Sequence, residues 1–140
     1  DLLVNYYFDG TRDDRLAFKS FFQAEALIRQ YKILEAIEML DYIRQEHPEA
    51  LITPLSTLRL ALLLLESDQF EQALLTALSI ENSHLKDRGL ALAGEIEERL
   101  LGNQENALKL YHRILSECQN SLLVEPVRFH IRKLTKLQES

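Results

Sequence analysis

Three stretches of the chain share one pattern, and this pattern constrains the fold more than any other feature. They read ILEAIEMLDYI from residue 33, FEQALLTALSI from residue 70 and QENALKLYHRI from residue 104. In each stretch an alanine is followed directly by Ile or Leu, and an isoleucine lies seven residues after the alanine. The alanines, Ala36, Ala73 and Ala107, are 37 and then 34 residues apart, close to the period of about 34 residues typical of helix-pair repeats. The chain is therefore predicted to consist of successive helix pairs.

The periodicity of the apolar side chains predicts an all-α fold. Apolar residues recur every three or four positions, and the chain holds only four Gly and three Pro. Helices are expected at 13–30, 33–46, 55–66, 70–81, 86–101, 104–118 and 122–137. Because the connections between them are short, neighbouring helices are expected to run antiparallel.

Charge and composition exclude several classes of function. The 22 acidic and 16 basic residues leave a net charge of −6, which disfavours nucleic acid as a partner. The longest apolar run, LALLLL at 60–65, is too short to cross a membrane. Because residue 1 is Asp rather than Met, we expect a fragment of a longer protein. A soluble domain of either the cytoplasm or the periplasm suits the composition, and the compartment stays open.

The first of the three stretches, extended to ILEAIEMLDYIRQEHPEA, resembles the second helix of a tetratricopeptide repeat. The resemblance covers about residues 17–137. It implies that Ala36, Ala73 and Ala107 hold the small position where the two helices of a pair cross closely, and that Pro48 ends its helix. It also implies a right-handed superhelical stack of about three antiparallel helix pairs plus a capping helix, a fold used to bind other proteins.

The resemblance divides the single domain into an N-terminal extension at 1–12, repeats at 13–50, 51–85 and 86–120, and a capping helix at 121–140. Ala24, Ala61 and Gly94 match the small position of the first helices. Between Gly94 and Gly102 the third repeat carries about one residue more than the pattern. In the last helix, Val124, Val127, Ile131 and Leu134 are expected to face inward, and its Arg and Lys residues to face solvent.

Side chains that would carry chemistry are few and scattered. The four histidines, at 47, 84, 112 and 130, show no metal-binding spacing. The lone Cys118 is expected to pack as a small apolar residue. Glu95, Glu97, Glu98 and Glu105 are interpreted as surface residues. No nucleotide-binding or hydrolase motif occurs, so we expect neither catalysis nor a cofactor or metal.

One apolar stripe exceeds what packing within a helix pair requires. Leu55, Leu58, Leu62 and Leu65 follow one another at spacings of three, four and three on one face of their helix. In the family that the chain resembles, this face of the first helices lines a concave groove. The matching positions of the first repeat are Phe18, Phe21, Glu25, Ile28 and Arg29. These nine residues are predicted to form a partner-binding groove.

Three occupants of this groove stay open at the level of sequence. The first is a helix or extended segment of another protein, the second is the chain's own LLVNYYF at 2–8, and the third is a second copy of the chain. The predicted function is a non-catalytic protein-interaction or scaffolding module. The alternative is a regulatory or structural domain of a larger enzyme or of a bacterial cell-envelope assembly.

Overall fold

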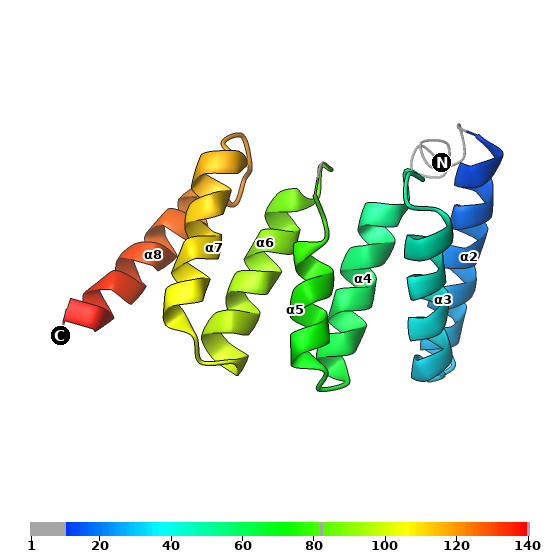
Figure 1. Cartoon of the computed structure of the whole chain (residues 1–140), viewed down its shortest axis with the longest axis horizontal. Helices are drawn as coiled ribbons and strands as arrows, with labels where there is room; N and C mark the ends of the chain where they lie inside the picture. Colours follow the sequence, from blue (N-terminus) through cyan, green and yellow to red (C-terminus); the bar gives the residue numbers. More distant parts are fainter. Residues whose placement is uncertain (1–10, 82, 140) are drawn as a thin grey trace. The chain divides into compact units, whose positions relative to one another are not determined.

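The computed structural model describes residues 11–81 and 83–139, and this part of the chain is helical without a β-strand (Figure 1). The α-helices are α2 (Arg12–Arg29), α3 (Ile33–Glu46), α4 (Thr53–Glu66), α5 (Phe70–Leu78), α6 (Lys86–Glu95), α7 (Gln104–Glu117) and α8 (Val124–Glu139). A π-helical turn, η1 (Ile96–Leu100), continues α6. The predicted all-α class is confirmed. The connections are short, as the sequence indicates.

The chain divides between Gln69 and Phe70 into two compact units, called unit 1 and unit 2 below. In unit 1, α3 packs against both α2 and α4. Helix α2 begins with a capping box, in which the Thr11 side chain accepts a hydrogen bond from the Asp14 amide and the Asp14 carboxylate accepts one from the Thr11 amide. The core of unit 1 consists mainly of buried Ala17, Ala24, Ala36, Leu40, Ile43, Ile52, Leu60, Ala61, Leu63 and Leu64.

In unit 2, α6 packs against α5 and α7, and α7 packs against α8 (Figure 1). A cluster of buried residues joins α6, α7 and α8: Leu90, Ala107, Tyr111, Ile114, Val127, Ile131 and Leu134. Arg132, Lys133 and Lys136 of α8 are exposed. Helix α8 therefore has the inward apolar and outward basic faces that its sequence predicts.

The three repeated alanines are completely buried, as expected for a small position. The turns that precede α3, α5 and α7 also share a backbone feature. Tyr31, Asp68 and Gly102 all have positive φ, at 59°, 61° and 67°. Like the alanines, these residues are 37 and 34 positions apart. A left-handed residue ends a helix by redirecting the chain, so the three turns reverse the backbone in the same way.

The extra residue between Gly94 and Gly102 is taken up by η1. There the Leu101 amide donates to the carbonyl oxygen of Ile96, five residues earlier, at 2.9 Å. A π turn of this kind holds one residue more than an α-helical turn. The end of this helix is therefore rotated relative to a regular α-helix.

Helix α5 ends at Leu78, three residues before the predicted end at 81. The hydroxyl of Thr76 donates to the Gln72 carbonyl oxygen at 2.7 Å, and that of Ser79 donates to the Thr76 carbonyl oxygen at 2.6 Å. Such side-chain bonds compete with the helical backbone pattern. The hydroxyl groups of Thr76 and Ser79 thus favour an early end of the helix.

Two glycines of α6 allow close helix contacts. A Cβ atom on Gly94 would lie 2.4 Å from a ring carbon of Tyr111 on α7, and one on Gly89 would lie 2.7 Å from the backbone oxygen of Ala77 on α5. The second obstacle is backbone and cannot rotate away. The α5–α6 contact therefore requires glycine at position 89.

We predict that Gly89→Ala lowers the free energy of unfolding by about 1–3 kcal/mol, because the added methyl group overpacks the α5–α6 contact. Urea unfolding followed by circular dichroism measures the change. In an unobstructed helix the same substitution would stabilise by up to about 1 kcal/mol, so a gain in stability would contradict the close contact.

Candidate functional site

The predicted groove residues all lie in unit 1, on α2 and α4. Phe21, Glu25 and Ile28 are half-buried and Arg29 is exposed. Phe18 is 6% exposed, and its ring centre lies 5.0 Å from that of Phe22 one turn further along α2. Phe18 thus belongs to the core of unit 1 and offers little surface to a partner.

The leucine stripe of α4 is half-buried along its whole length. Leu55, Leu58, Leu62 and Leu65 all have intermediate exposure, whereas the buried residues of the same helix include Leu60, Leu63 and Leu64. Two separate apolar faces therefore exist on α4. The face with Leu60, Leu63 and Leu64 is buried in the core of unit 1. The face with the leucine stripe remains partly accessible to solvent.

An ion pair joins the two helices that carry the predicted groove. Arg59 Nε of α4 donates to Glu25 Oε1 of α2 at 2.9 Å, and the two side chains are 31% and 26% exposed. Arg59 lies four residues after Leu55 and three before Leu62, hence beside the stripe. The pair links the half-buried faces of α2 and α4 and contributes no net charge.

We predict that Glu25 and Arg59 are energetically coupled. A double-mutant cycle built from Glu25→Ala and Arg59→Ala should give a coupling energy of about 0.2–1 kcal/mol, the range of partly exposed pairs. The coupling should shrink at high salt, because ions screen exposed charges. Unfolding in urea at two salt concentrations provides the measurement, and strictly additive single effects would argue against the α2–α4 contact.

A polar cluster that the sequence interpretation missed connects η1 with α7 and α8. Glu98 Oε1 accepts hydrogen bonds from the Tyr111 hydroxyl at 2.9 Å and from His130 Nε2 at 2.7 Å. The rings of Tyr111 and His130 meet edge to face, with centres 5.3 Å apart. Three elements of unit 2 are thereby tied together by one carboxylate.

The interpretation of the glutamates as surface residues is wrong for two of the four. Glu97 is 7% exposed and the Glu98 side chain 17% exposed, whereas Glu95 and Glu105 are exposed as predicted. One extra residue turns a helical position by about 100°, so the π turn changes which side chains face inward. The excess residue before Gly102 is the sequence signal that points to this change.

The surroundings of Glu98 favour its ionised form. Burial by itself would raise the pKa of Glu98, but the hydrogen bonds from His130 and Tyr111 and the charge of Arg99 outweigh it and lower the pKa below its usual value. Burial and the bond to Glu98 raise the pKa of Tyr111, so its hydroxyl remains protonated. The cluster therefore stabilises the fold through two hydrogen bonds, which the Tyr111 hydroxyl and His130 donate to the Glu98 carboxylate.

We predict that Glu98→Gln destabilises unit 2 by about 1 kcal/mol at neutral pH, because the variant lacks the charge that strengthens both hydrogen bonds. Since the pKa of Glu98 is lowered by folding, this contribution is present above pH 4.5 and is lost as the pH falls through the folded-state pKa. Urea unfolding at pH 7 and in acid should show the difference from wild type shrinking. The exposed Glu105→Gln is the control and should change little at either pH.

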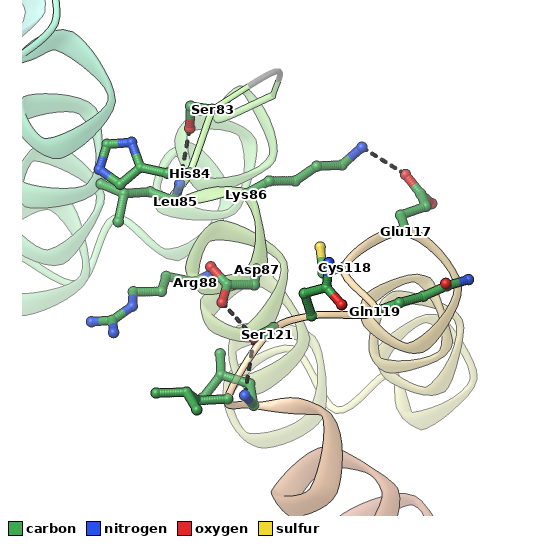
Figure 2. A pocket seen from close by; sticks show the side chains of 13 residues that line it. Ser83, His84, Leu85, Lys86, Asp87, Arg88, Glu117, Cys118, Gln119 and Ser121 are labelled. Atoms are coloured by element: carbon green, nitrogen blue, oxygen red, sulfur yellow. Dashed lines mark hydrogen bonds and ion pairs between the residues drawn. The ribbon is translucent and has the colours of Figure 1, made fainter.

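A pocket of about 530 Å³ lies in unit 2 between the start of α6 and the connection from α7 to α8 (Figure 2). Its walls carry two polar ties. Lys86 Nζ contacts Glu117 Oε1 at 2.8 Å, and the Ser121 hydroxyl donates to Asp87 Oδ2 at 2.5 Å. Arg113 and Lys86 lower the pKa of Glu117 to about 2. The sequence interpretation did not anticipate this pocket.

Cys118 also lines the pocket and packs against the edge of the core cluster of unit 2. Burial, followed by the nearby charge of Asp87, raises the pKa of its thiol. A thiol with a raised pKa is a poor nucleophile at neutral pH. Packing against the core agrees with the expectation from sequence.

Neither a metal site nor a membrane-spanning helix is found in the described residues. Among residues 11–81 and 83–139, no three His, Cys, Asp or Glu side chains are grouped so that they could hold a metal ion. Within the same ranges no helix combines the length and apolarity needed to span a bilayer. The segment LLVNYYF, one candidate occupant of the groove, lies outside the described residues.

Comparison with known proteins leaves the family open. No protein family, no curated protein and no solved structure matches the chain significantly.

Proposed function

We propose that the chain is a non-catalytic protein-interaction module, built as a right-handed superhelical stack of tetratricopeptide-like helix pairs with α8 as the cap. The observation that carries this proposal is the pair of half-buried faces on α2 and α4, joined by the Glu25–Arg59 ion pair. The buried repeated alanines and the positive-φ turns, which recur at the same spacings of 37 and 34 positions, support the repeat assignment.

The chemistry of these faces favours an apolar partner segment. Leu55, Leu58, Leu62 and Leu65 extend over about three helical turns, roughly 15 Å, with Phe21 and Ile28 on the facing helix. Because Glu25 and Arg59 neutralise each other, a charged anchor gains little there. An amphipathic helix of another protein, with apolar residues at spacings of three and four, suits such a groove.

The proposal predicts that position 62 contacts another protein. A photo-reactive amino acid in place of Leu62 should cross-link a partner in cells, whereas the same group at Leu75, an exposed leucine of α5, should not. Leu62→Asp should remove cross-linking from a reporter at Leu58, because a charge in an apolar interface is costly to desolvate. Circular dichroism of Leu62→Asp should show nearly unchanged helical content.

Three results would count against this groove. Unfolding of Leu62→Asp would place Leu62 in the core. A cross-link only to a second copy, with light scattering showing a dimer, would make the face a self-association surface. Adducts that form only within one chain, together with new self-association after removal of residues 1–10, would mean that the chain fills its own groove.

A further inference from the structure

Two connections in the chain have the same backbone structure. The α3–α4 corner comprises residues 47–53 and the α7–α8 corner residues 118–124, so that equivalent positions differ by 71 in number. The first residues of the corners, His47 and Cys118, have φ and ψ of −131° and 55° and of −127° and 52°. The first corner belongs to unit 1 and the second to unit 2.

Their backbone hydrogen bonds also correspond. In the first corner the amides of His47, Ala50 and Thr53 donate to the carbonyl oxygens of Ile43, His47 and Ala50. In the second corner the amides of Cys118, Ser121 and Val124 donate to the oxygens of Ile114, Cys118 and Ser121. All six N–O distances lie between 2.8 and 3.3 Å. The backbones of the two corners are therefore equivalent.

The first corner is occupied by an acidic helical turn from the same unit. The Leu51 amide donates to Asp14 Oδ1 of α2 at 2.9 Å, and His47 Nδ1 lies 2.5 Å from Asp13 Oδ1. Both aspartates belong to the first turn of α2, which starts 12 residues before the small buried Ala24. The first turn of α2 therefore binds the first corner through its two aspartate side chains.

The second corner is engaged differently: Asp87 in the first turn of α6 accepts a hydrogen bond from the Ser121 hydroxyl, and no carboxylate of α6 accepts from the Leu122 amide. Helix α6 starts only eight residues before Gly94, one turn later than α2 relative to Ala24, and it begins without a side-chain cap. The pocket of Figure 2 lies at this place, between residues 83–88 and 117–123. The smaller Cys118 stands where the first corner has His47. The later helix start and the smaller side chain together leave the space open.

Leu51 and Leu122 allow the exposure of the two corners to be compared directly, because they are the same residue type at equivalent positions. Leu51 is 39% exposed and Leu122 is 92% exposed. The Leu51 amide donates to a carboxylate, whereas the Leu122 amide donates to no group in the described ranges. The second corner thus presents the same donor without its acceptor.

Two acidic and two basic residues line the pocket, Asp87 and Glu117 with Lys86 and Arg88, and both acidic side chains already have partners. Asp87 is bonded to Ser121, and Glu117 is paired with Lys86 and Arg113. Arg88 forms no ion pair within the described part of the chain, and Figure 2 shows its guanidinium on the side of α6 away from the Lys86–Glu117 pair. His84 is exposed at the rim. The accessible cation and the amide of Leu122 both favour a carboxylate.

We propose that the α7–α8 corner binds an acidic segment of a partner protein, an aspartate-bearing helical first turn, in the way that the first turn of α2 occupies the α3–α4 corner. The ligand carboxylate accepts the hydrogen bond of the Leu122 amide and lies within reach of Arg88. This site is in unit 2 and is independent of the leucine groove of unit 1.

The chain's own sequence supplies the probe. An acetylated, amidated peptide TRDDRLAFKS, copied from residues 11–20, is titrated into the ¹⁵N-labelled protein and followed by NMR. The amide signals of Ser121 and Leu122 should shift and saturate. The same peptide carrying Asp13→Asn and Asp14→Asn should bind about tenfold or more weakly, because charge-assisted hydrogen bonds are lost.

Three protein variants sharpen the test. Arg88→Glu should reduce the shift. Arg132→Glu, which changes another exposed cation on α8 outside the pocket, should leave it unchanged. Leu62→Asp, which disrupts the proposed groove of unit 1, should also leave the peptide-induced shift unchanged. Failure of the groove proposal and failure of the corner proposal can then be distinguished.

The proposal is overturned if both peptides bind equally, if neither shifts Leu122, or if the shifts appear at Leu51 instead. Shifts of Leu122 that depend on protein concentration without peptide would assign the site to a second copy of the chain and overturn the partner assignment.

Discussion

The structure depends on close contacts between helices at small residues. Ala36, Ala73 and Ala107 are fully buried, and Gly89 and Gly94 lie where even a methyl group would meet a neighbouring helix. Helices that approach so closely leave little room between their backbones, so the other side chains must pack to the sides of the contact. This constraint determines which face of α4 is buried in the core and which face remains partly accessible to solvent.

The largest core residue of unit 2 shows how one contact shapes its surroundings. Tyr111 occupies the position four residues after the repeated alanine, where the other two stretches have Leu40 and Ala77. Its ring lies over Gly94, whereas α2 and α4 have Ala24 and Ala61 in the corresponding place. A buried phenol also needs a hydrogen-bond acceptor. The π turn supplies it by turning Glu98 inward, where it also binds His130.

Much of the fold follows from the sequence, because the apolar period and the repeated alanines depend only on local residues. The helix positions, the buried alanines and the two faces of α8 are examples. The early end of α5 and the inward turn of Glu97 and Glu98 do not follow so simply. They depend on how hydroxyl groups and an inserted residue are accommodated in three dimensions. The groove residues of α2 are predicted from the resemblance alone, and Phe18 shows that a face assigned in this way can include a residue that belongs to the core.

The two corners show why a pocket can escape a sequence pattern altogether. Their chains differ in residue type at most positions, with HPEALIT in one and CQNSLLV in the other, yet their hydrogen bonds coincide. Within the corners Cys118 replaces the larger His47. The other difference lies elsewhere in the chain, in the starting points of α2 and α6. A capping box starts α2 early enough for Asp14 to reach Leu51, and α6 has no capping side chain and starts a turn later. The accessible donor at Leu122 is therefore a consequence of helix length, a property that no motif within the corner encodes.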